Sequence, residues 1–287
     1  KKHKRHKPFF TLVLLVPLCG KPVLVSRKRL HLHAEHLRVL TDDRGGDPRD
    51  RKPSAGLGPC RHVPASSPAH PATILDTVTD IAMFPLGSVL FPHMPLLLKV
   101  FEDRYLIMLS QILQDEPSEF GVALIERGQE VGGGEQRFPV ATVAKITQMD
   151  ATEGFVVLVA EGGRRVEVDQ WLDDDPYPRA LVTEMAELVW TDDLQPLRDR
   201  AEESVRRLIA LASEFADQTW PADITLADDP VAAAWQLAAI APFGPLDQVT
   251  LLRSGSLQQL LENIIEFAVG AELTLRAPWA DDEEFPD

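Results

Sequence analysis

Short apolar runs separated by turn residues dominate the chain between Ile81 and Val189. Most are too short for a helix, and valine alternates with a charged residue over 165–168, which is the period of a strand with one buried face. The paired glycines within 161–164 predict a tight hairpin turn, because glycine accepts positive φ. The expected extended segments are 83–86, 89–92, 120–126, 140–149, 155–160, 165–171 and 179–189. We therefore predict a mainly antiparallel, twisted, barrel-like sheet of about six strands.

A helical period appears once within this region and returns after Trp190. Apolar residues recur on one face over 102–113, which predicts a helix packed on the sheet. Three further helices are expected at about 192–215, 229–241 and 256–268. Their expected caps are Asp192 or Asp193, Asp228 or Asp229 followed by Pro230, and Ser256 with Gln259 as a capping box. The predicted fold class is α+β, a β domain followed by a small C-terminal helical bundle.

Charge divides the chain into two unlike parts. Residues 1–80 contain 15 Lys and Arg against 7 Asp and Glu, a net charge of +8, whereas residues 81–287 contain 14 against 37, a net charge of −23. We therefore divide the chain into a basic extension rich in proline and glycine at 1–80, a β domain at 81–190, a helical bundle at 191–270 and an acidic tail at 271–287.

The basic extension has the composition of a segment without a packed core, and we expect it to be disordered. Its first seven residues are basic and are followed by an apolar stretch at 8–19, as in a secretory signal or a membrane-surface anchor, but no small-x-small cleavage site follows. The first methionine is Met83, so an upstream sequence that is not normally part of the protein is the preferred interpretation. Histidines 31, 33 and 36 are interpreted as scattered residues rather than a metal-binding tract.

Common catalytic sets are missing from residues 81–287. A P-loop needs a Gly-Lys pair, and the only lysines here, Lys99 and Lys145, do not follow glycine. His93 is the only histidine, which excludes a site with two histidine ligands within this part. A Ser–Lys dyad on Lys145 or a triad on His93 stays open without positive support. We expect no catalytic residue, no metal and no cofactor.

Two further patterns have a ligand-binding and a structural interpretation. The acidic clusters at 173–175, 192–193 and 228–229 could bind a divalent cation, but they lack the alternating spacing of a calcium loop, so solvated surface and helix caps are preferred. The glycines at 132–134 could cradle an anion. Because Glu130 and Glu135 flank them, a flexible loop is the preferred interpretation.

An ordered series of motifs covers about 81–190. It comprises Met-Phe-Pro-Leu-Gly-Ser-Val-Leu-Phe-Pro at 83–92, Phe-Glu-Asp-Arg-Tyr at 101–105, Glu-Val-Gly-Gly-Gly at 130–134, Gly-Arg-Arg-Val at 163–166 and Asp-Pro-Tyr-Pro at 175–178. This series closely resembles the N-terminal substrate-binding domain of the ATP-dependent protease La (Lon). The resemblance implies a PUA-like β pseudobarrel followed by helices, and a stand-alone form without the ATPase and peptidase domains. The motif positions that carry it are Pro85, Pro92, Phe101, Glu102, Arg104, Tyr105, Arg165, Trp171, Pro176 and Tyr177.

The resemblance implies a non-catalytic module that binds unfolded or client polypeptides, with a protease or chaperone as a possible partner. The segment with the first prolines has more apolar side chains than a short sheet edge usually buries. If part of this surface is open, it is a candidate for peptide binding. The alternative is that these side chains fill the core. These residues are Phe84, Leu86, Leu90, Phe91 and Met94. Glu102 and Arg104 are expected to pair and cap the junction between strand and helix.

Two other functions are kept as alternatives. One is a peptidase or other hydrolase that uses Lys145 or His93, and the other is RNA binding through the PUA-like sheet. The net charge of −23 in residues 81–287 disfavours nucleic acid, because phosphates would be repelled. A bacterial-type protein in the cytoplasm is expected, with no membrane partner for 81–287 and with export as the alternative suggested by the first nineteen residues.

Overall fold

Six strands form one sheet in the structure, a computed structural model that describes residues 78–114, 116–152, 154–215 and 220–277. The strands are β1 (Thr79–Leu86), β2 (Pro95–Val100), β3 (Glu119–Arg127), β4 (Gln136–Thr152), β5 (Phe155–Trp171) and β6 (Arg179–Glu184). Every pairing is antiparallel except that of β1 with β3. The predicted α+β fold with a mainly antiparallel sheet is therefore confirmed.

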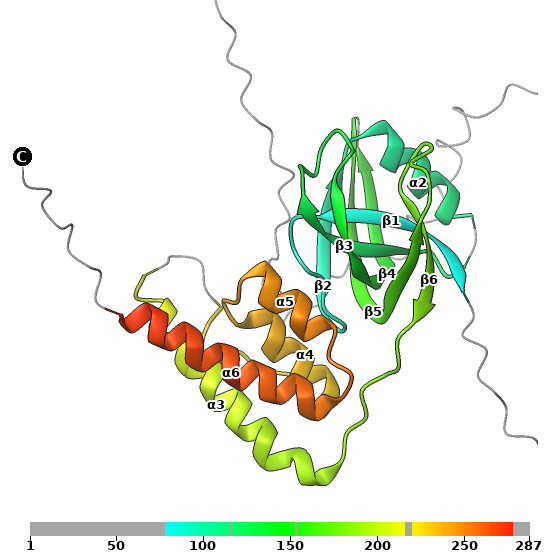
Figure 1. Cartoon of the computed structure of the whole chain (residues 1–287). Helices are drawn as coiled ribbons and strands as arrows, with labels where there is room; N and C mark the ends of the chain where they lie inside the picture. Colours follow the sequence, from blue (N-terminus) through cyan, green and yellow to red (C-terminus); the bar gives the residue numbers. More distant parts are fainter. Residues whose placement is uncertain (1–77, 115, 153, 216–219, 278–287) are drawn as a thin grey trace, which may run out of the picture. The chain divides into compact units, whose positions relative to one another are not determined.

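Strand β5 organises this sheet because it pairs with three others. The order is β2-β5-β4-β3-β1-β6, and β6 pairs back onto β5 (Figure 1). The first half of β5 lies between β2 and β4, and its second half lies between β4 and β6. Five strands thus close into a barrel, and β2 is added outside the ring on β5.

The predicted hairpin turn at 161–164 is wrong, because β5 runs straight through both glycines. The chain reverses instead between β4 and β5, where Gly154 has φ +87°. Gly162 serves close packing: a Cβ there would lie 2.3 Å from the carbonyl oxygen of Phe91. The Gly162 N–H donates to the Met94 carbonyl at 2.9 Å and the Gly162 carbonyl accepts from the His93 N–H at 2.7 Å. A glycine pair therefore marks close approach of two backbones as well as turns.

Other expected strands also differ from the observed ones, and strand β2 was not expected. The segment 179–189 is a strand only as far as Glu184, and 89–92 is not a strand. The basic extension is described only from residue 78, and β1 begins at Thr79. The expected disorder of the residues before 78, and the acidic tail beyond 277, lie outside the described residues.

Two groups of buried side chains use the two faces of the strands. The barrel interior contains mostly small and β-branched residues, as its narrow diameter requires. They are Ile81, Met83, Ala123, Ala141, Val143, Val166, Val168, Ala180 and Val182. Alternate residues of the same strands, such as Phe84 and Val122, face outward into a second core. This second core includes α2 (Asp103–Ile112) and continues without interruption into the C-terminal helices.

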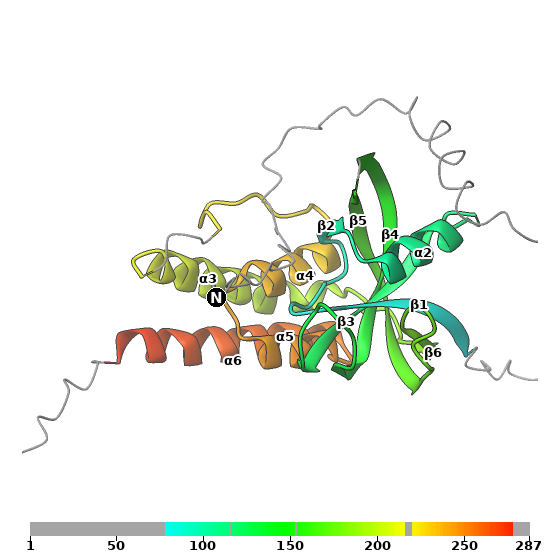
Figure 2. The same ribbon diagram turned by 90° about the horizontal axis from the view of Figure 1, so that it is seen from above.

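The C-terminal part contains a 3₁₀ turn and four helices. They are η3 (Asp192–Leu194), α3 (Gln195–Ala212), α4 (Pro230–Ile240), α5 (Pro245–Leu252) and α6 (Leu257–Arg276). α3 and α6 lie side by side (Figures 1 and 2). Two of the predicted caps are confirmed: Asp229 Oδ1 accepts from Ala232 N–H at 2.7 Å, and Ser256 Oγ accepts from Gln259 N–H at 3.1 Å. In the described ranges, no helix is both long and apolar enough to cross a membrane.

Sequence patterns missed three features of these helices. Asp192 and Asp193 belong to the 3₁₀ turn, and α3 begins only at Gln195. Helix α5 was not expected, because its eight residues are too few to give a clear helical period. Helix α6 continues eight residues beyond its expected end at Ala268.

Arg165 of β5 joins the barrel to the helices. Its buried guanidinium donates three hydrogen bonds of 2.7–2.8 Å to the carbonyl oxygens of Leu252 and Ser254 at the end of α5 and to that of Ala186. Burial lowers the pKa of Arg165, since no carboxylate faces it among the described residues. Carbonyls at the end of a helix suit a cation because they lack intrahelical partners.

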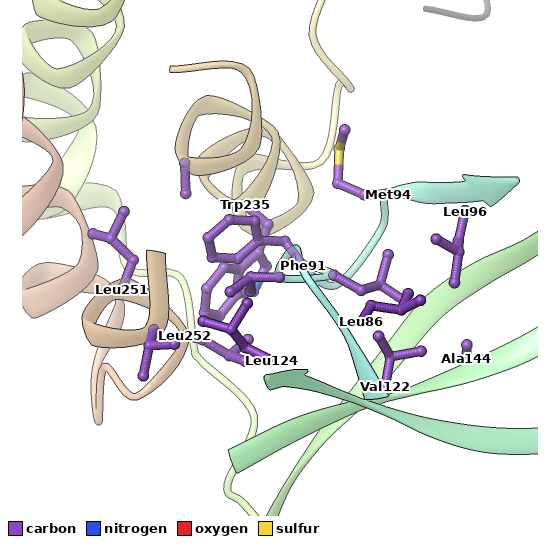
Figure 3. Packing of buried hydrophobic residues seen from close by; sticks show 14 of the residues in the cluster. Leu86, Phe91, Met94, Leu96, Val122, Leu124, Ala144, Trp235, Leu251 and Leu252 are labelled. Carbon is purple, nitrogen blue, oxygen red and sulfur yellow. The ribbon is translucent and has the colours of Figure 1, made fainter. Parts of the chain in front are cut away.

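An aromatic contact lies beside this arginine. Phe91 stacks on Trp235 of α4 at a ring-centroid distance of 5.9 Å, and the Arg165 guanidinium lies 5.1 Å from the centre of the same Trp235 ring. Figure 3 shows Phe91 and Trp235 against one another, with Leu251 and Leu252 close by. Charge-assisted hydrogen bonds and apolar packing thus act at one junction.

We predict that Arg165→Met lowers the free energy of unfolding by about 3 kcal/mol, because it leaves three carbonyl oxygens without their donor in a buried place. Urea denaturation followed by circular dichroism measures the change. Arg164→Met is the matched control: Arg164 pairs with Glu119 at 2.6 Å near the surface, so its loss is expected to cost about 1 kcal/mol or less. Equal losses for the two variants would contradict the assigned role of Arg165.

Candidate functional site

The five residues proposed to bind peptide all lie inside the molecule. Their exposed fractions are 5% or less, and all belong to the core that runs from the barrel into the helices. Phe84 stacks on Tyr105 of α2 at 4.0 Å, and Phe91 is covered by Trp235. The others are Leu86, Leu90 and Met94. These side chains therefore form no open surface in the described structure: α2 covers Phe84, α4 covers Phe91, and the other three are buried in the same core.

Glu102 and Arg104 fix the junction before α2, as expected, but without a side-chain cap. Arg104 Nε donates to Glu102 Oε2 at 3.1 Å, and Glu102 is the N-cap residue without accepting a capping bond. Glu102 Oε2 accepts from the Gly132 N–H at 3.4 Å, and Glu130 Oε1 accepts from the Gly87 N–H at 2.6 Å. The first glycine of the loop at 132–134 thus donates to a carboxylate of the chain itself, and that negative charge opposes an anion there.

Most of the other motif positions are buried or make side-chain contacts, whereas Phe101 and Pro176 are exposed. Tyr105 is fully enclosed, which raises the pKa of its phenol. The Tyr177 hydroxyl donates to the Gln111 side chain, and the Arg137 guanidinium lies 4.9 Å from the centre of the Trp171 ring. Pro85 and Pro92 are buried.

The residues of the hydrolase alternative do not assemble into a site. His93 is exposed at φ +60°, and Lys145 is exposed on β4. Neither lines either of the two hollows described for this structure. In the part of the chain that is described, no group of three or more His, Cys, Asp or Glu side chains is placed to hold a metal ion.

A groove with a volume of about 790 Å³ lies on the C-terminal helices. Its walls come from the end of α3, the connection between α4 and α5, and the second half of α6. The lining side chains are mostly apolar, and the lining consists of Leu208, Ala212, Phe215, Pro242, Phe243, Gly244, Asp247, Glu266, Phe267, Gly270, Ala271, Thr274 and Leu275. Such a concave apolar site is the usual form of a binding site for an apolar group.

Large apolar side chains are exposed in and beside this groove. Phe215 is 57% exposed in its wall, and Leu246 of α5 is 67% exposed next to the lining residue Asp247. On α6, Val269 and Leu273 are exposed three and seven residues after the lining residue Glu266, so helical geometry places them on the adjoining stripe. Neighbouring exposed apolar groups of this kind mark an interaction surface.

The α6 wall of the groove is the part that sequence reasoning missed. Helix α6 was expected to end at Ala268, yet Ala271 and Leu275 line the groove on its continuation, together with Phe267 just before the expected end. A usable signal was present, because these three residues follow one another at intervals of four. Gly270, which usually indicates the end of a helix, lies in the middle of this stretch.

The charge of the groove is negative. Asp247 and Glu266 are in its lining, which contains no lysine or arginine. An apolar surface with carboxylates at its rim favours apolar ligands, and disfavours anionic ones such as nucleic acid.

Comparison with known proteins identifies the family. The model of the ATP-dependent protease La (LON) substrate-binding domain matches residues 80–269. The chain belongs to this family. No curated protein matches it.

Solved structures of Lon N-terminal domains resemble the chain at low identity. A Lon N-terminal domain protein from Xanthomonas campestris is 23% identical, with a TM-score of 0.48 over 66% of this chain and 98% of that chain. The N-terminal domain of Mycobacterium avium complex Lon protease is 16% identical, with a TM-score of 0.48 over 67% of this chain and 98% of that chain. The family assignment itself rests on the family model.

We predict that Gly270→Ala stabilises this Lon-family chain by about 0.5–1 kcal/mol, because glycine in a helix interior loses more backbone entropy than alanine on folding. A Cβ at Gly270 meets no atom within 4 Å, so no strain offsets the gain. Urea denaturation measures the difference. A loss of stability would show that this turn of α6 is not helical in solution.

Proposed function

We propose that this chain is a non-catalytic polypeptide-binding module, and that the apolar groove on α3 and α6 receives an apolar segment of a client polypeptide. The groove is the observation that carries the proposal: it is apolar and concave, and large exposed side chains continue it. Membership of a family of substrate-binding domains supports the same function.

The size of the groove suits a few side chains of an unfolded polypeptide. Burying one leucine or phenylalanine side chain contributes roughly 1.5–3 kcal/mol. Two or three such side chains, after the ordering of the bound segment is subtracted, lead to a dissociation constant on the order of micromolar to millimolar. Weak, sequence-tolerant binding of this kind is suited to a module that meets many clients.

The finer assignments belong to the same proposal. A closed, mainly antiparallel barrel with helices supports the PUA-like classification. The partner would be an unfolded client, with a protease or chaperone acting downstream, and the cytoplasm stays the expected location. Hydrolysis and RNA binding remain less favoured, since the described residues bring together no catalytic set around His93 or Lys145 and the groove is acidic.

Blocking the groove is expected to abolish client binding. Gly270→Trp places an indole in the lining, where there is room for a Cβ, and we expect binding of a fluorescent unfolded model protein to weaken at least ~10-fold. Fluorescence anisotropy with the full chain measures it. Gln258→Trp is the matched control, because Gln258 is exposed on the same helix outside the groove.

Unchanged affinity of folded Gly270→Trp would overturn the placement of the site in this groove. Absence of binding by the wild-type chain to a broad panel of unfolded proteins would overturn the function itself. Thermal denaturation of each variant establishes that it is folded.

A charge on the exposed stripe of α6 is expected to weaken binding without unfolding the protein. Leu273 is 67% exposed, so Leu273→Asp should change the free energy of unfolding by about 0.5 kcal/mol or less. Loss of its apolar contact should weaken client binding roughly 3–10-fold, as a partly buried side chain contributes about 1 kcal/mol. Val189→Asp, at a residue 72% exposed outside both hollows, is expected to bind like the wild type. Equal effects of the two substitutions would contradict a role for α6 and favour a general effect of charge.

A further inference from the structure

A second hollow, of about 520 Å³, lies on the first half of α3 and differs in character from the apolar groove. Side chains of α3 and the segment before α4 form it, and polar groups predominate in its lining. Its principal residues are Trp190, Arg198, Glu202, Arg206, Thr225 and Asp228. It shares no lining residue with the groove, so its function is a separate question.

Arg198 is the unusual residue of this pocket. Its side chain is only 19% exposed, and its Nε is buried without a hydrogen-bond partner. Its two ion-pair contacts, with Asp199 Oδ1 and Glu202 Oε2, are both 3.6 Å long, which is beyond hydrogen-bond length. A charged donor without a close acceptor destabilises the protein, so an acceptor that approaches the Nη atoms of Arg198, whose ion pairs are both 3.6 Å long, has a free-energy advantage there.

Arg206, two helical turns further along α3, shows the contrast. Its Nε and Nη2 donate to Glu202 Oε1 at 2.9 and 2.8 Å, and it also donates to the carbonyl oxygens of Ala222 and Ile224. Arg206 therefore holds the wall of the pocket in place. Glu202 is shared by both arginines, and Arg206 holds it at hydrogen-bond distance, so the two carboxylates near Arg198, Asp199 and Glu202, both stay 3.6 Å from its guanidinium.

We propose that the Arg198 pocket binds a carboxylate of a polypeptide, either the C-terminal carboxylate or that of an Asp or Glu side chain. A guanidinium presents parallel N–H donors that match the two oxygens of a carboxylate. The exposed rim residues Asp223 and Asp228 oppose a doubly charged phosphate more strongly than a singly charged carboxylate. That the molecule carrying this carboxylate is a client polypeptide rests on the proposed function.

The two hollows are placed to act on one chain. Arg198 and Leu208 both belong to α3, ten residues apart, and Ala212 lies four residues further on. At 1.5 Å per residue the pocket and the groove are roughly 15–21 Å apart along the helix axis, and their lining residues lie on different faces of α3, so an extended polypeptide needs at least about five to six residues to span them. A carboxylate about six residues from an apolar segment is thus the ligand that fits both.

The test uses three peptides with the same apolar segment: one with a free C-terminal carboxylate six residues away, one amidated, and one amidated with an Asp at that distance. Binding to the full chain is measured by fluorescence anisotropy. The wild type is expected to bind at least one carboxylate peptide about 10-fold more tightly than the amidated one. The two carboxylate peptides distinguish the terminal from the side-chain source.

Substitution of Arg198 is expected to remove this preference. Arg198→Met keeps the aliphatic part of the side chain, and Arg198→Lys keeps the charge without the two parallel N–H donors of the guanidinium. Both variants should bind all three peptides with the affinity that the wild type has for the amidated peptide. Arg200→Met is the matched control, because Arg200 is exposed on the same helix outside the pocket and should keep the preference. Thermal denaturation is expected to show both Arg198 variants folded, since no hydrogen bond of Arg198 within the described chain is lost.

Three results would overturn the inference. They are equal affinity of the wild type for all three peptides, a preference retained by both Arg198 variants, and suppression of the preference by millimolar inorganic phosphate but not by acetate. Binding of the amidated peptide separates the two proposals: if it persists without any preference, the pocket inference fails and the proposed function stands. If none of the three binds, both fail.

Discussion

A buried cation without a carboxylate partner holds this molecule together at the place where the barrel meets the helices. Arg165 is stable inside the protein only because the end of α5 and the segment after β6 present three carbonyl oxygens to it. Transfer of a charge out of water is costly unless hydrogen bonds replace the lost hydration. Strand β5 and the C-terminal helices therefore depend on each other. Because they are joined at Arg165, one core runs without a break from Phe84 to Trp235.

Because α4 and α5 form this junction, surfaces of α3 and α6 stay accessible to a ligand. Contacts with the barrel are made by α4 and α5 through Trp235 and Leu252, whereas both hollows lie along α3. One hollow is apolar with acidic residues in its lining, and the lining of the other includes an arginine whose Nε has no hydrogen-bond partner. Two chemically different hollows on one helix are an arrangement that favours an extended ligand with two kinds of group, and a family of substrate-binding domains is a suitable setting for it.

Two helix caps could be predicted from the sequence, whereas the role of the paired glycines and the burial of apolar residues could not. Asp229 and Ser256 were identified as caps because a cap depends only on its own next three residues. The glycines at 162 and 163 were misread because a turn and a close approach of two backbones both require a missing side chain, and only the position of Phe91 distinguishes them. The end of α6 was placed too early because Gly270 lies within a helix that α3 supports from the side.

By itself, the sequence determined the α+β class, a sheet region followed by helices, the acidic character of residues 81–287 and the family resemblance, since each follows from composition or from neighbours along the chain. Only the tertiary structure decided which apolar residues are available to a ligand. Phe84 and Phe215 are equally apolar in the sequence, yet one is enclosed by α2 and the other is exposed at the end of α3. The physical reason is that burial depends on what packs against a side chain, and residues distant in the sequence supply that packing.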